Sequence, residues 1–188
     1  TVTVDLAGFV YVSGAFAVEK TDVGNNVDAY NAVGVATPDG IDDQITSTMT
    51  MGAELTEAFI GVGRGTSAEV GLKATGGQLG LYSRTVATQT ADPATGTVTD
   101  AKFAVKGSLD FVGLVGIPAI ELSANDLSVE INRTGETLAS VPDIDTDGNP
   151  ATDGVNMLFG STADVTKASG TVTVDLAGFV YVSGAFAV

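Results

Sequence analysis

Three aspartates at alternate positions are the side chains in this sequence best suited to binding chemistry. Asp143, Asp145 and Asp147 precede Gly148 and form the pattern D-x-D-x-D-G. Alternate carboxylates of this kind can converge on one hard cation, and glycine permits the sharp turn between them. The pattern therefore predicts a Ca²⁺ site, with an acidic solvated turn between strands as the other interpretation.

The residues that follow this pattern could complete the site only in part. Asn149 and Asp153 could add oxygen ligands. An EF-hand loop requires glutamate at its twelfth position, which here is Gly154, so a complete EF-hand loop is not present. A looser calcium site is what this loop predicts.

A second acidic group, Asp39, Asp42 and Asp43, could also hold calcium. Its spacing is irregular, and Pro38, Asp39 and Gly40 together are typical of a tight turn. The turn is the favoured interpretation. No other cofactor is indicated.

The composition argues against catalysis and against several partners. The chain has no His, Cys or Trp, which removes imidazole and thiol chemistry and the indole platform on which sugars stack. We therefore expect no enzymatic activity. The net charge of −15 argues against nucleic acid and anionic membrane surfaces, both of which require a basic face. No apolar run reaches the roughly 18 residues of a membrane span.

The elements that must position these loops are predicted to be strands. Apolar and polar residues alternate with a period near two, and no stretch keeps a helical period. The predicted strands lie at 8–20, 45–52, 55–63, 67–84, 101–117, 119–132, 155–160 and 164–176.

The sequence TVTVDLAGFVYVSGAFAV occurs twice, at 1–18 and at 171–188, without a single difference. This identity indicates a duplication, with residues 1–170 as one complete repeat unit and residues 171–188 as the start of the next unit. The alternation in this segment also predicts one long apolar strand with few charges. It is therefore the predicted contact between neighbouring repeats, through these residues: Val4, Leu6, Phe9, Val10, Tyr11, Val12, Phe16, Val174, Leu176, Phe179, Tyr181 and Phe186.

The predicted fold is all-β, with bent strands stacked in a β-solenoid-like tandem repeat. Interior glycines in the strands and a weak likeness between residues 4–19 and 115–130 favour stacked rungs. Bead-like β-sandwich repeats are the alternative.

Several stretches resemble a module found in tandem in very large, acidic, secreted bacterial surface proteins. They include GFVYVSGAFAVEK, VGLKATGGQLGLYSR, AKFAVKGSLDFVGLVGIPAIELSANDLSVEINRTG and ADVTKASGTVTVDLAGFV. The resemblance covers most of the unit and implies an extracellular or cell-surface, adhesin-like or fibre-like protein. It carries no catalytic signature.

These observations predict a structural repeat of an extracellular bacterial filament or giant surface adhesin. Its partners would be neighbouring copies of the same repeat, paired through strands at the repeat boundary. The alternative is a calcium-dependent module that binds surface glycans or another surface. Deletion of 171–188 is expected to expose a sheet edge and cause aggregation or misfolding.

Overall fold

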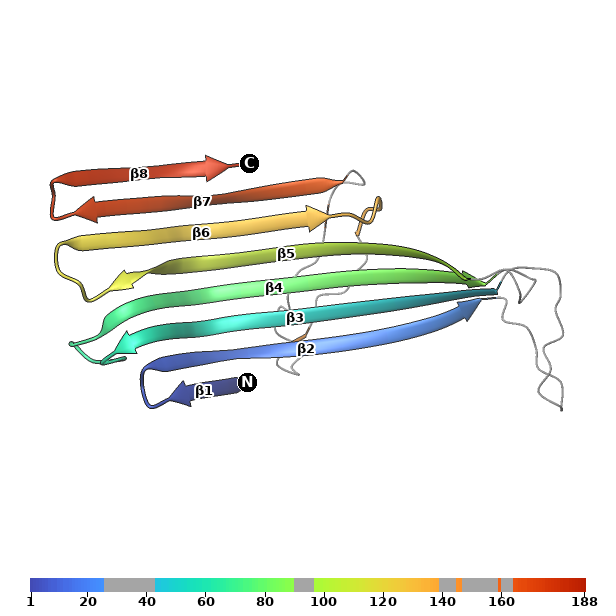
Figure 1. Cartoon of the computed structure of the whole chain (residues 1–188), viewed down its shortest axis with the longest axis horizontal. Coiled ribbons are helices and arrows are strands. Elements are labelled where there is room, and N and C mark those ends of the chain that lie inside the picture. The colour runs from blue at the N-terminus through green and yellow to red at the C-terminus, as the bar shows by residue number, and fades with distance from the viewer. Residues whose placement is uncertain (26–42, 90–96, 139–144, 147–158, 160–163) are drawn as a thin grey trace.

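The computed structural model describes residues 1–25, 43–89, 97–138, 145–146, 159 and 164–188. The described residues form eight strands (Figure 1). The strands are β1 (Val2–Leu6), β2 (Val10–Asn25), β3 (Asp43–Val62), β4 (Val70–Gln89), β5 (Thr97–Val115), β6 (Ile120–Asn132), β7 (Val165–Leu176) and β8 (Val180–Ala187). The predicted all-β fold is confirmed.

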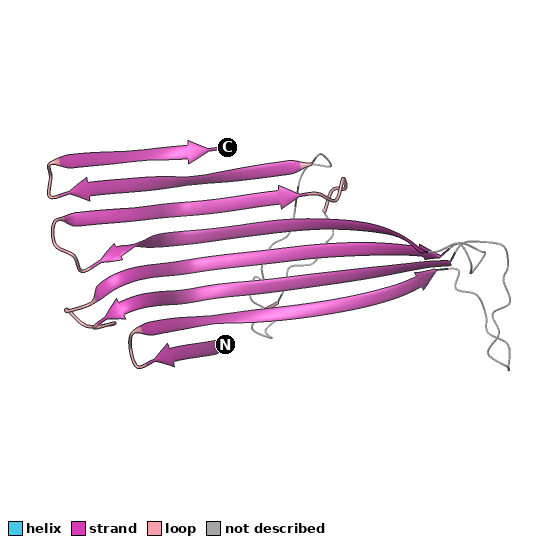
Figure 2. Ribbon diagram, viewed as in Figure 1, coloured by secondary structure: helices cyan, strands magenta, loops and turns pink. Residues whose placement is uncertain are grey.

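All eight strands belong to one open sheet, and each strand pairs antiparallel with the next one along the chain. Figure 2 shows this single layer of strands. Short turns join β1 to β2, β3 to β4, β5 to β6 and β7 to β8 at one end of the sheet (Figure 1). In the part of the chain that is described, no helix has the length and apolar character to cross a membrane.

The solenoid-like expectation and the sandwich alternative both differ from this arrangement. A solenoid stacks parallel rungs, whereas here every described pair of strands is antiparallel. A sandwich needs two sheets, and the described strands form one. The physical reason lies in the connections at 7–9, 63–69, 116–119 and 177–179, which are too short for a parallel crossover.

The duplicated segment is a hairpin in both of its copies, where the sequence predicted one long strand. Ala7 and Gly8 both have left-handed backbone angles, with φ of 52° and 73°, and Phe9 N–H donates to Leu6 O (3.0 Å). Positive φ at both central positions defines the tight turn that matches the twist of paired strands. The turn recurs at Ala177 and Gly178, with φ of 55° and 70°. The chain therefore reverses direction in the middle of each copy.

An aspartate stabilises each of these turns from the preceding strand. Asp5 Oδ1 accepts a hydrogen bond from Gly8 N–H at 2.8 Å, and Asp175 Oδ1 accepts one from Gly178 N–H at 2.9 Å. The side chain thus satisfies a backbone donor that the turn would otherwise leave to solvent. Asp5 and Asp175 are accordingly turn-forming residues of the hairpin.

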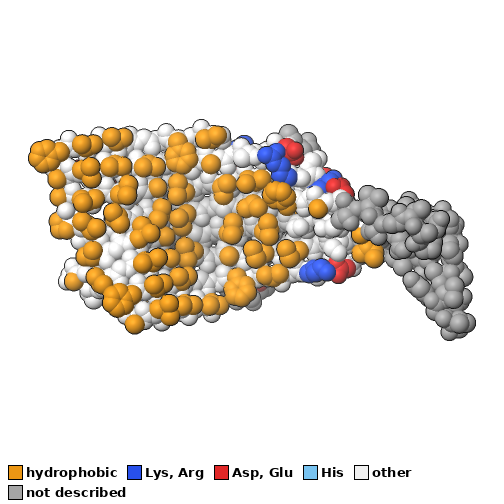
Figure 3. Space-filling model, in the orientation of Figure 1, with side chains coloured by type: hydrophobic (Ala, Val, Ile, Leu, Met, Phe, Trp, Pro, Cys, Tyr) orange, Lys and Arg blue, Asp and Glu red, His pale blue; other side chains and the backbone are white. Residues whose placement is uncertain are grey.

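One face of the sheet, which we call the apolar face, is covered by apolar side chains at alternate positions of every strand (Figure 3). The register places Val4, Val12, Ala58, Ala74, Val112, Ala124 and Val172 in one row across the sheet. A neighbouring row alternates small and large residues, with Gly14, Leu55, Gly77 and Leu109 in sequence across the strands. A shallow hollow of about 710 Å³ lies over the second of these rows and has lining residues from all eight strands.

The opposite face is polar and carries the small buried core of the described residues. Leu138 and Phe159, from the connection between β6 and β7, are 5% and 4% exposed. They form a cluster with the fully buried Ala104, against which Ala17 and Tyr82 also pack. Leu138 and Phe159 therefore both pack against the polar face.

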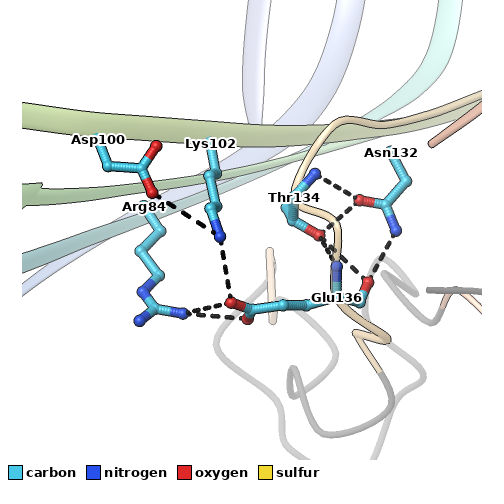
Figure 4. Close-up of polar contacts among 6 residues, drawn as sticks. All are labelled: Arg84, Asp100, Lys102, Asn132, Thr134 and Glu136. Atoms are coloured by element: carbon cyan, nitrogen blue, oxygen red, sulfur yellow. Dashed lines mark hydrogen bonds and ion pairs between the residues drawn. The ribbon is translucent and has the colours of Figure 1, made fainter. Parts of the chain in front are cut away.

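A hydrogen-bonded turn after β6 starts this connection (Figure 4). Asn132 is fully buried, and its Oδ1 accepts hydrogen bonds from Thr134 N–H (3.0 Å) and Thr134 Oγ1 (2.6 Å), while its Nδ2 donates to Glu136 O (3.0 Å). The Glu136 carboxylate accepts two bonds from Arg84 Nη1, at 2.9 and 3.0 Å. Lys102 Nζ lies 3.5 Å from the same carboxylate. The turn is thereby fixed to β4 and β5.

Candidate inter-repeat interface

The structure places the predicted contact residues on the two hairpins built by the duplicated segment. Within each hairpin, the register of the two strands is the same: Leu6 pairs with Val10, and Leu176 pairs with Val180. The side chains on the apolar face are Val4, Leu6, Val10, Val12 and Phe16 in the first copy and Val174, Leu176 and Phe186 in the second copy. Tyr11 and Tyr181 point to the polar face, and Phe9 and Phe179 end the turns.

In the second copy, the first strand of the hairpin is covered by β6. The register runs from Ile120 opposite Leu176 to Asn125 opposite Thr171. Beyond the strand ends, Ala177 N–H donates to Ala119 O at 2.5 Å and so joins the two neighbouring turns. The segment preceding this copy continues the pairing, and Ser128 and Ser169 share a hydrogen bond of 2.8 Å.

In the first copy, the second strand of the hairpin is covered by β3. Val10 pairs with Ile60, and a register shift lies between Ser13 and Gly14. At the turn, Gly61 N–H donates to Phe9 O at 2.9 Å. A Cβ on Gly14 would collide with the backbone carbonyl of Glu54. The close approach of β3 therefore requires glycine at position 14.

The two copies are exposed on opposite flanks. Among the described residues, β1 pairs with β2 alone and β8 pairs with β7 alone. Ser13 is buried, whereas Ser183, at the same place in the second copy, is exposed. Gly184, the counterpart of Gly14, has nothing within 4 Å of where a Cβ would stand. Among the described residues, each hairpin therefore has one edge paired with a neighbouring strand (the filled flank) and one edge without such a strand (the open flank).

A cluster of four charged residues lies beside the first hairpin. The Arg64 guanidinium lies 3.1 Å from the centre of the Tyr11 ring. It donates to both carboxylate oxygens of Glu57, at 3.1 and 2.7 Å. Lys73 Nζ lies 3.0 Å from Glu69 and 3.6 Å from Glu57. Gly65 N–H donates to Glu69 Oε2 at 2.7 Å. The cluster therefore ties the turn between β3 and β4 to β2.

Hydrogen bonding shifts the ionisation of this cluster toward the charged forms. The hydrogen bonds from Arg64 hold the pKa of Glu57 below its ordinary value of 4.5, although partial burial acts in the opposite direction. The backbone hydrogen bond from Gly65 lowers the pKa of Glu69. The hydrogen bond that Lys73 donates to Glu69 raises the pKa of Lys73. Groups stabilised as charged partners of one another serve structure rather than proton transfer. Nothing in the sequence indicated this cluster, since its members are separated by up to sixteen residues along the chain.

The predicted calcium ligands fall mostly outside the described residues. Asp39, Asp42, Asp143, Asp147, Asn149 and Asp153 lie there. Asp145 is described and exposed, and Asp43 is the first residue of β3. The structure thus does not bring the predicted ligands of either site together within its described part, where no group of three or more acidic side chains is placed to hold a metal.

Comparison with known proteins finds no protein family, no curated protein and no solved structure that matches this chain.

Proposed function

We propose that this chain is a structural repeat of an extracellular bacterial filament or giant surface adhesin, without catalytic activity, whose units join as one sheet. One observation carries the proposal: the same eighteen residues form a hairpin twice, once with β6 on its first strand and once with β3 on its second strand. A single hairpin could pair with β6 and with β3 at the same time, because these two strands bind its opposite edges. A hairpin between two units would then have both flanks paired.

The open flanks support this proposal on physical grounds. An exposed strand edge presents a row of unpaired N–H and C=O groups, which invites pairing with another strand. The strands at the two edges, β1 and β8, consist only of residues from the duplicated segment. The secreted, surface location rests on the resemblance of the quoted stretches to repeat modules of bacterial surface proteins. The net charge of −15 would help keep a large assembly soluble.

The experiment is to measure how the length of the particle grows with the number of units. Chains would carry two and three copies of residues 1–170 ahead of residues 171–188. Each period adds six strands, β2 to β7, so we expect the sheet to lengthen by about 29 Å per unit at about 4.8 Å per strand. Small-angle scattering and electron microscopy would measure this increment. Separate beads on flexible linkers, with no constant increment, would contradict the proposal.

A further inference from the structure

We propose that β6 can take the 1–18 hairpin of a second copy of this chain in place of its own 171–188 hairpin, which makes residues 171–188 a built-in cap against head-to-tail assembly. This inference rests on the strand pairing of the proposed function, but concerns separate chains rather than units within one chain. The partner is a second copy, because only a strand of this sequence reproduces contacts that the structure already shows.

The structure defines the acceptor side of this contact. β6 holds the 171–176 strand through the register from Ile120 to Asn125, and Ala119 O accepts a hydrogen bond from Ala177 N–H. Because residues 1–7 are identical to residues 171–177, each of these contacts can form with the other copy. The register between chains would place Ile120 opposite Leu6 and Asn125 opposite Thr1.

The folded chain already presents the donor strand, β1, as part of a formed hairpin. The 1–18 hairpin is already closed by its turn and held by β3, including the hydrogen bond from Gly61 N–H to Phe9 O. All five residues of β1 are exposed, whereas only Val172 and Leu176 are exposed among their five counterparts in β7. Presentation of a preformed strand reduces the ordering entropy that pairing costs.

The two hairpins compete for β6 on unequal terms. Their contacts with β6 would be the same, so the exchange is close to balanced in contact energy. The chain's own hairpin is tethered to residues 165–170, the part of β7 that precedes it, which gives it an effective concentration in the millimolar range. A second copy competes only at its actual concentration. Exchange of the hairpin on β6 between intact chains should therefore be rare at micromolar concentration, and weakening the cap should favour it.

The duplication supplies a matched pair of variants for the test. Proline lacks the backbone N–H and obstructs a strand ladder. Thr173→Pro weakens the cap and leaves the donor hairpin intact, whereas Thr3→Pro weakens the donor and leaves the cap intact. We expect full-length T173P to associate at least about tenfold more tightly than T3P in sedimentation equilibrium. The double variant T3P/T173P should lose this association.

A T173P chain that stays folded by circular dichroism and monomeric would overturn the proposal, and so would a double variant that associates as strongly as T173P. A second measurement uses the unmodified full chain in case T173P unfolds. A fluorescent peptide with the sequence of residues 1–18, titrated to about millimolar concentration so that it can compete with the tethered hairpin, should bind it saturably. The same peptide with proline at its third position should bind at least about tenfold more weakly. Equal binding of the two peptides, or no binding of either, would contradict the inference. The constant length increment of covalent tandem chains is independent of both outcomes.

Discussion

Gly14 and Gly184 occupy the same place in the duplicated segment but meet different neighbours. At Gly14, β3 approaches so closely that any Cβ would collide with Glu54 O. At Gly184 the corresponding space is open. One residue type therefore satisfies a packing requirement in the first copy that is absent around the second copy. A strand that pairs with β8 as β3 pairs with β2 would restore that requirement.

Alanine at these two positions should have unequal effects in the 188-residue chain. Gly14→Ala should lower the free energy of unfolding by about 2 kcal/mol, because the backbone of β3 must shift to admit the methyl group. Gly184→Ala should stay within about 0.5 kcal/mol of the unmodified chain, as for other exposed sites. Urea unfolding followed by circular dichroism gives both values. Equal losses at the two positions would show that the contact with β3 is not the cause.

Not all of the hairpin could be read from the residues. Two-residue turns with left-handed angles are normally recognised by Asn-Gly or Asp-Gly. Here the first turn residue is alanine, at Ala7 and again at Ala177, and alanine gives no such signal. The segment was therefore predicted as one strand, and the reversal in its middle was missed. The prediction of a repeat boundary does not depend on this turn, because it rests only on the identity of residues 1–18 and 171–188.

At the scale of the elements, the alternation of apolar and polar residues predicted strands in the right places within the described part of the chain. The strand predicted at 155–160 lies outside the described residues except for Phe159, which is not in a strand. The predicted strands at 101–117 and 119–132 correspond to β5 (Thr97–Val115) and β6 (Ile120–Asn132). Those at 45–52 and 55–63 are one strand, β3, whose register shifts opposite Ser13 and Gly14. Alternation does not reveal which strands are neighbours, so the meander order could not be predicted.

The charged cluster beside the turn of β3 and β4 should make the fold sensitive to acid. The pKa of Glu57 is lower in the folded chain than its ordinary value of 4.5. The Glu57 carboxylate therefore contributes fully to the free energy of unfolding above pH 4.5, and this contribution is lost as the pH falls through the lower pKa of the folded chain. The raised pKa of Lys73 leaves its own contribution unchanged over this range, since it is lost only above its ordinary value of 10.5.

Glu57→Gln should therefore lower the free energy of unfolding by about 1 kcal/mol at neutral pH, because it removes the charged partner of Arg64. The difference from the unmodified chain should shrink as the pH falls below 4.5, the ordinary value for glutamate. The matched control is Glu54→Gln on the same strand, whose carboxylate makes no ion pair among the described residues. A pH-independent loss for E57Q would contradict the assignment.

At the scale of the whole molecule, the sheet is a single layer with unlike faces. The ion pairs of Glu57, Glu130 and Glu136 lie on the polar face together with Leu138 and Phe159. Apolar side chains from all eight strands line the hollow on the other face, which also carries the exposed pair Lys20–Asp22. A composition of 44% hydrophobic residues predicted enough apolar material for a core. It could not predict that this material would spread along one face, because arrangement depends on strand pairing rather than on amount.

Calcium binding remains a prediction from the D-x-D-x-D-G pattern, and it would raise the stability of the whole molecule. If the loop binds Ca²⁺ only when folded, calcium at about 100 times its dissociation constant should add about 2.7 kcal/mol and raise Tm by a few degrees. Thermal melting with calcium, with a chelator and with magnesium at equal ionic strength measures this effect. Replacement of Asp143 and Asp147 by Asn should abolish it. An unchanged Tm in all conditions would remove the calcium proposal.

The count of strands between the two hairpins has a consequence for symmetry. From β1 to β7, and from β2 to β8, the chain passes through six strands, and six is even. An even count returns the chain to the same direction, as the parallel course of β1 and β7 shows (Figure 1). The register also places Val4 and Val174 on the same face. An odd count would turn every second unit upside down; an even count relates successive units by translation and the twist of the sheet alone.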